Sequence, residues 1–252
     1  MITQYHRPKT LDEALKILSK PNILPLGGGT LLSHLISDSV EVVDLQALGL
    51  NSIKKSGNNL EIGATATLQQ LHEDVNCSHA LNSALKLEAP LNLRNAATVA
   101  GAIVTCDGRS TFVTALLALD AKLTIINPKS EIIDLGDFLP LRPRGLITAI
   151  TIPLNVKFAF DDVARTPADK PIVCVALAQW PSGRTRLAVG GYGNSPRLAM
   201  DGTEAEGVEA AARNAFHEAN DEWSSAEYRM DVIATLVNRC LETMNETSNK
   251  QD

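Results

Sequence analysis

The sequence predicts an α+β protein built from two or three subdomains. Three observations support this prediction: helix and strand patterns alternate near the start of the chain, mixed patterns follow, and two apolar strands precede a final helix. At 252 residues, the chain is long enough to bury a sizeable core. No Gly-x-Gly-x-x-Gly motif is present, so the alternation does not predict a Rossmann fold.

The first part of the chain predicts a helix followed by short strands. Thr10 and Glu13 have the spacing of a capping box, and apolar residues follow at helical spacing as far as Leu18. Pro21 comes directly after the expected end of this helix. Short apolar runs predict strands at residues 23–26, 40–45 and 60–62.

The middle of the chain predicts three helices and two strands. The helices are expected at residues 67–73, 78–88 and 110–121. The third helix leads into an expected strand at residues 122–126. A β-branched run that ends at Pro153 predicts a further strand at residues 145–152.

The last part of the chain predicts strands followed by a helix. Two antiparallel strands are expected at residues 171–179 and 184–190, after a short connection at residues 158–170. Residues 200–223 are polar and rich in Ala and Glu, which is typical of a weak helix or of a connection. A final helix is expected to begin near Ser224, with a frayed tail after it.

The composition excludes several classes of function. Aromatic residues make up only 4% of the chain and the net charge is −6, which argues against a surface that binds nucleic acid. No apolar run is long enough to span a bilayer, and the first residues lack the regions of a signal peptide, so we expect a cytoplasmic protein. The four cysteines form no Cys-x-x-Cys pair, and no His-x-x-x-His pair occurs, so no metal site is expected. Since motifs for hydrolysis are also missing, the sequence favours a redox cofactor held mainly by the backbone.

Three consecutive glycines, Gly27, Gly28 and Gly29, follow the strand predicted at residues 23–26. Without side chains the backbone can turn sharply there, and its N–H groups can approach a phosphate or a diphosphate. A tight strand-to-helix turn without a ligand is the alternative explanation. A second segment of small residues, at 98–102, favours the ligand site.

Several motifs resemble one known family. Residues 26–32 resemble the Ala-Gly-Gly-Thr/Gln-Asp/Ser-Leu loop of the FAD-binding subunits of molybdenum hydroxylases. Leu93-Arg94-Asn95, followed by residues 98–102, is similar to the Ile-Arg-Asn … Thr-Ile-Gly-Gly-Asn segment of that family. The similar segments continue in chain order at residues 114–121, 145–153, 186–196 and 225–242. The ordered set covers nearly the whole chain and most resembles the medium subunit of carbon monoxide dehydrogenase.

The resemblance implies an FAD-binding type 2 (PCMH-like) fold of two subdomains, followed by a small C-terminal domain with a β-sheet and a helix. The FAD-binding domain is expected at residues 1–155, with subdomains at about 1–56 and 57–155, and the C-terminal domain at residues 156–252. The resemblance also implies a flavoprotein, an oxidoreductase subunit that passes electrons from iron–sulfur clusters of a partner to an external acceptor. The implied partners are a molybdopterin-binding large subunit, where the substrate is oxidised, and a 2Fe-2S small subunit, so the protein is expected to be a hetero-oligomer.

By position, the resemblance implies no catalytic residue and no metal ligand in this chain, only residues that bind FAD. The first loop corresponds to Gly27, Gly28, Gly29, Thr30 and Leu31, and the second loop to Thr98, Val99, Ala100, Gly101 and Ala102. Leu146 and Ile147 are expected near the isoalloxazine ring. Asp107 either substitutes for an acid of the family or lies in a surface loop.

Five positions depart from the family pattern. Leu31 replaces an Asp or Ser, Ala100 a Gly, Ala102 an Asn and Thr111 an Asp, and Asp161 or Asp162 stands where a lysine is expected. An alanine restricts close approach of the backbone, and an acid near a phosphate is unfavourable. The alternative prediction is therefore a structural or assembly subunit that has lost FAD binding or binds FAD weakly.

Overall fold

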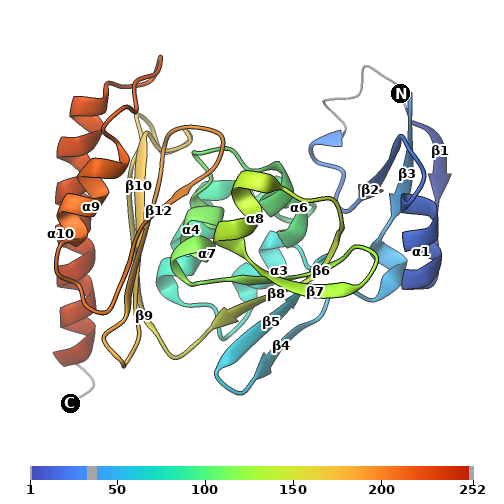
Figure 1. Ribbon diagram of the computed structural model, residues 1–252, viewed down its shortest axis with the longest axis horizontal. Helices are drawn as coiled ribbons and strands as arrows, with labels where there is room; N and C mark the ends of the chain where they lie inside the picture. Colours follow the sequence, from blue (N-terminus) through green and yellow to red (C-terminus); the bar gives the residue numbers. More distant parts are fainter. Residues whose placement is uncertain (1, 33–38, 250–252) are drawn as a thin grey trace.

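The computed structural model describes residues 2–32 and 39–249, and its strands form three sheets that follow one another along the chain (Figure 1). The first sheet is parallel, with the strand order β1 (Ile2–His6), β3 (Val40–Asp44) and β2 (Ile23–Leu26). Helix α1 (Leu11–Leu18) packs against this sheet, and the 3-10 helix η1 (Gln46–Leu48) follows β3. As predicted, Thr10 caps α1, because its hydroxyl accepts a hydrogen bond from the N–H of Glu13 at 3.3 Å.

The second sheet is antiparallel and carries most of the short helices. Its strand order is β4 (Ile53–Ser56), β5 (Asn59–Gly63), β8 (Leu146–Pro153), β6 (Lys122–Ile126) and β7 (Ser130–Asp134). The helices of this part are α3 (Leu68–Glu73), α4 (His79–Glu88), α5 (Leu91–Arg94), α6 (Val99–Thr105), α7 (Thr111–Ala118) and α8 (Leu135–Leu141). Strands β4 and β5 pair as a hairpin around residues 57 and 58, and the subdomain division at about residue 56 stays a prediction.

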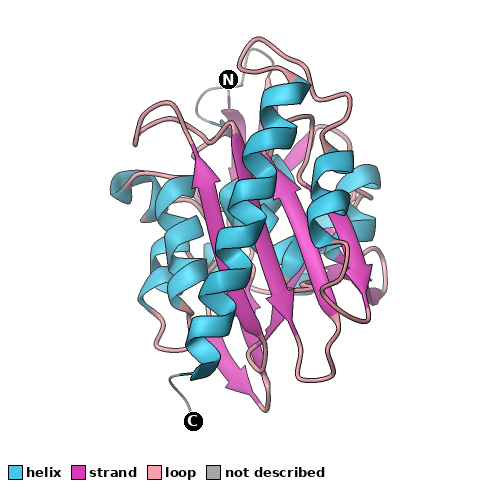
Figure 2. Ribbon diagram, turned by 90° about the vertical axis from the view of Figure 1, so that its left-hand side faces the viewer, coloured by secondary structure: helices cyan, strands magenta, loops and turns pink. Residues whose placement is uncertain are grey.

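The third sheet is antiparallel, and two helices cover its outer face (Figure 2). Its strand order is β12 (Arg197–Gly202), β11 (Thr185–Gly190), β10 (Val173–Gln179) and β9 (Lys157–Val163). The covering helices are α9 (Val208–Ala215) and α10 (Ala226–Asn249). On β10, the larger side chains Val173, Val175 and Leu177 belong to the cluster beneath these helices.

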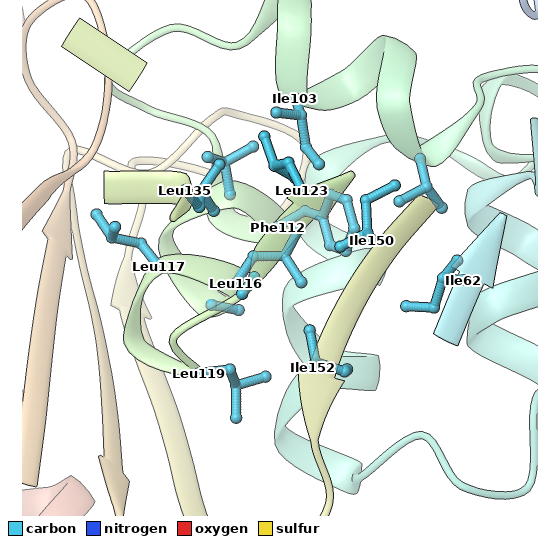
Figure 3. Packing of buried hydrophobic residues seen from close by; sticks show 14 of the residues in the cluster. Ile62, Ile103, Phe112, Leu116, Leu117, Leu119, Leu123, Leu135, Ile150 and Ile152 are labelled. Carbon is cyan, nitrogen blue, oxygen red and sulfur yellow. The ribbon is translucent and has the colours of Figure 1, made fainter. Parts of the chain in front are cut away.

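Helix α7 lies at the centre of the main core. All eight of its residues are buried. Phe112 and Leu116 share a cluster with Leu123 and Ile150 of the second sheet (Figure 3). Alanines of β10 and β11 belong to the same cluster and contact α7 from the other side. The helix therefore packs between the second and third sheets and joins the two parts of the chain.

The predicted α+β class is confirmed, and most predicted elements are present within one to three residues of their expected bounds. Residues 157–163, expected to belong to a connection, instead form β9, which pairs with β10 over seven residue pairs. Residues 200–223 hold the end of β12 and helix α9. The final helix is capped by Ser225 rather than Ser224, since the Ser225 hydroxyl accepts a hydrogen bond from the N–H of Tyr228 at 3.2 Å. Within residues 2–32 and 39–249, the helices are all too short or too polar to traverse a lipid bilayer.

Candidate functional site

The glycine loop lies at the edge where the three parallel strands of the first sheet end. The loop follows β2, Arg7 follows β1, and Asp44 is the last residue of β3. In open sheets with parallel strands, ligands bind outside the carboxyl ends of the strands. A hollow of about 380 Å³ opens at this edge, and it is lined by Tyr5, Arg7, Leu26, Gly27, Gly28, Gly29, Asp44 and Gln46.

The glycine loop supplies backbone donors at this hollow. Among the described residues, the N–H groups of Gly27, Gly28 and Gly29 have no hydrogen-bond acceptor. Gly29 has a φ of +70°, a conformation that favours glycine. Consecutive N–H groups without an internal acceptor suit the oxygens of a phosphate or diphosphate. The loop therefore fits the diphosphate of FAD, the cofactor that the sequence predicts.

The structure brings the two predicted loops into direct contact. A Cβ atom added to Gly28 would lie 1.7 Å from the carbonyl oxygen of Ala96, and one added to Gly27 would lie 2.7 Å from Oγ1 of Thr98. Two of the three glycines thus allow close approach of the backbone to another part of the protein. Glycine at position 28 is required by this packing whether or not a ligand is bound.

The second segment is the start of a helix, and this differs from the expected open loop. Thr98 caps α6, and its hydroxyl accepts the N–H of Gly101 at 3.2 Å. The N–H groups of Val99 and Ala100 donate to carbonyls of Ala66 and Ala64, and the N–H of Ala102 donates to the carbonyl of Thr98. These backbone donors are all occupied within the protein, so residues 98–102 support the glycine loop by packing. Their expected contact with FAD stays a prediction.

A carboxylate and a guanidinium share the hollow with the glycine loop. The Asp44 carboxylate is only 5% exposed and accepts hydrogen bonds from the hydroxyl of Tyr5 and, at 2.9 Å, from the N–H of Gln46. The hydrogen bond to Asp44 raises the pKa of Tyr5. Nε of Arg7 lies 3.5 Å from Oδ2 of Asp44, and the Arg7 side chain is 66% exposed. Arg7 thus balances part of the negative charge of Asp44 at the hollow.

Leu146 and Ile147 are core residues in this structure. Each is only 5% exposed. Leu146 packs in the small cluster of the first sheet with Val43, and Ile147 packs in the main core. The contact of these two residues with the isoalloxazine ring stays a prediction. Leu31, in contrast, is 39% exposed beside the glycine loop.

The acids that the sequence singled out lie outside the lining of the hollow. Asp107 is exposed and forms an ion pair with Lys170 at 2.6 Å. Asp161 lies 3.7 Å from Arg239 on α10. Burial, followed by the charge of Asp161, raises the pKa of Asp162. A contact of Asp107 with FAD therefore also stays a prediction.

Sequence reasoning missed Glu88 and Arg7. The Glu88 carboxylate accepts hydrogen bonds from the hydroxyls of Ser110 and Thr111, at 2.8 and 3.3 Å, and from the N–H of Phe112 at 3.0 Å. It thus brings an acid to the first turn of α7, beside Thr111. Burial raises the pKa of Glu88. No sequence signal pairs Glu88 with α7. Strand β1, which precedes Arg7, was not predicted, so no local pattern pointed to Arg7 either.

Comparisons with known proteins agree with this geometry. The family described as "FAD binding domain in molybdopterin dehydrogenase" matches residues 1–155. The glyceraldehyde dehydrogenase medium chain of Sulfolobus acidocaldarius is 27% identical, and the alignment covers 92% of this chain and 94% of the relative. The carbon monoxide dehydrogenase medium chain of Afipia carboxidovorans is 24% identical, with 94% and 95% covered. Among solved structures, quinoline 2-oxidoreductase from Pseudomonas putida 86 matches with a TM-score of 0.82 at 21% identity, over 97% of each chain.

These similarities confirm the resemblance drawn from the sequence, the oxidoreductase class and FAD as the cofactor. The family match covers the first two sheets and the hollow between the strand ends and the glycine loop. The chain belongs to the family of FAD-binding domains of molybdopterin dehydrogenases.

Proposed function

We propose that this chain is the FAD-binding, electron-transfer subunit of a multi-subunit molybdenum hydroxylase. The observation that carries the proposal is the glycine loop, whose three N–H groups lack acceptors among the described residues and lie at the carboxyl ends of parallel strands. Bound FAD would supply reversible transfer of one or two electrons. The role of the chain is to hold the cofactor and to bring it to its redox partners.

The residues of this chain support the binding of FAD in two ways. The N–H groups of Gly27, Gly28 and Gly29 offer donors to phosphate oxygens. Residues 96–98 hold the loop in place, because Gly28 packs directly against the carbonyl of Ala96. A loop held by such packing loses little conformational freedom when a ligand binds.

We further propose that the partners are a molybdopterin-binding large subunit and a 2Fe-2S small subunit. The proposal is supported by the name "medium chain" of two relatives, which implies other chains in their complexes. Substrate oxidation would then occur in a partner. A cytoplasmic location is also proposed, because all four cysteines are free thiols, as in proteins of reducing compartments.

A flavin titration of the purified full-length chain tests the proposal. We expect saturable uptake of one FAD per chain, measured by quenching of flavin fluorescence, and a flavin visible spectrum in the isolated complex. Reduction of the bound flavin by the co-purified partners after addition of substrate would support electron transfer. A chain with a native circular dichroism spectrum that takes up no FAD would overturn the proposal and would favour a structural or assembly subunit.

A further inference from the structure

We infer that Arg7 is the cation that binds the phosphate groups held at the glycine loop, an inference that rests on the proposed function. Arg7 and the three glycines line the same hollow. Of the described residues that line it, Arg7 is the only cation and Asp44 the only acid. A diphosphate that enters this hollow would therefore meet one guanidinium and one largely buried carboxylate.

The Asp44 carboxylate lies beside the Arg7 side chain at the hollow. The carboxylate is itself held by the hydroxyl of Tyr5 and the N–H of Gln46, and it is almost completely buried. It lies 3.5 Å from Nε of Arg7. Among the described residues, the two terminal amino groups of Arg7 have no hydrogen-bond partner. A guanidinium that pairs with a carboxylate at its Nε side keeps these terminal donors for a bidentate contact with phosphate oxygens.

The charges that line the hollow favour this role for Arg7. Without Arg7, the Asp44 carboxylate would face an incoming diphosphate alone and would repel it. The backbone donors at the start of α6 are occupied within the protein and cannot compensate. The glycine N–H groups carry only partial positive charges. Arg7 therefore supplies the full positive charge that the loop lacks.

Affinity measurements on matched variants test the inference. Arg7→Gln removes the positive charge in the hollow, and Arg7→Lys retains it. The control is Lys16→Gln, which removes one positive charge from the exposed face of α1. Dissociation constants are measured by fluorescence titration for FAD and for riboflavin, which has the same ring system but no phosphate. We expect Arg7→Gln to weaken FAD binding about ten- to hundredfold, while Lys16→Gln stays close to the unmodified chain. Arg7→Lys should retain part of the affinity, and riboflavin binding should not change.

The outcomes separate the inference from the proposed function. If the unmodified chain binds FAD and Arg7→Gln binds it equally well, Arg7 forms only a surface ion pair and the inference is overturned. Equal losses of FAD and riboflavin affinity would show that the substitution disturbs the fold and would also overturn it. If the unmodified chain binds no FAD, the proposed function itself fails. Thermal unfolding of each variant shows whether the chain remains folded.

Discussion

Replacement of Gly28 by Ala tests the contact between the glycine loop and the second subdomain. The added Cβ would lie 1.7 Å from the carbonyl oxygen of Ala96 and 2.5 Å from its carbon, so the oxygen contact must lengthen to at least about 3 Å. Ala96 and Ala97 cannot easily move away, because both N–H groups donate to the carbonyl of Leu93, and the Ala97 carbonyl accepts the N–H of Leu68. Overpacking of a rigid contact costs about 2–3 kcal/mol. For a chain of this size, such a loss lowers Tm by about 4–12 °C.

Thermal unfolding followed by circular dichroism measures this loss. Gly136→Ala is the matched control, since the atom closest to its added Cβ is Cδ1 of Leu117 at 3.6 Å, an ordinary van der Waals contact inside helix α8. Alanine also has the higher helix propensity, so the control should keep or slightly raise Tm. We expect Gly28→Ala also to weaken FAD binding, because the loop must shift. An unchanged Tm for Gly28→Ala would refute the close packing of the two segments.

Two further predictions concern buried charged groups. Arg229 is fully buried, donates to four backbone carbonyls and pairs with Asp221 at 2.7 Å. Arg229→Met should therefore lower the free energy of unfolding, measured with urea, by about 3–5 kcal/mol. Arg239 is exposed, so the control Arg239→Met should lower it little. Equal urea midpoints for these two variants would contradict the role of the buried guanidinium. Because burial raises the pKa of Glu88 in the folded state, its carboxyl binds more protons there than in the unfolded chain, and stability should fall as pH rises through the raised pKa. The Glu88→Gln variant lacks this loss, so its stability relative to the unmodified chain should increase from about pH 4 upward. Parallel curves of stability against pH for the two proteins over about pH 4–7 would contradict the prediction.

Sequence reasoning predicted the elements that rest on local signals. The hydroxyl of Thr10 caps α1, as its capping-box pattern indicates. Apolar runs predicted β2 and β10, and in β10 the run is continuous because six of the seven residues are buried. Strand β9 was missed, since its residues are mostly half-buried and the strand is defined by pairing with β10. Pairing between strands depends on partners distant in the sequence, which a local pattern does not contain.

The candidate site also has features that local sequence predicts and features that depend on the folded chain. Local residues predicted the glycine loop and its position after a strand, and the family resemblance related the loop to residues 98–102. The folded chain was needed to show that Gly28 packs against Ala96, that the donors of α6 are occupied, and that Arg7 and Asp44 share the hollow. These facts depend on which backbone groups meet after folding. Hydrogen-bond saturation and charge balance are properties of that arrangement, so no run of residues encodes them locally.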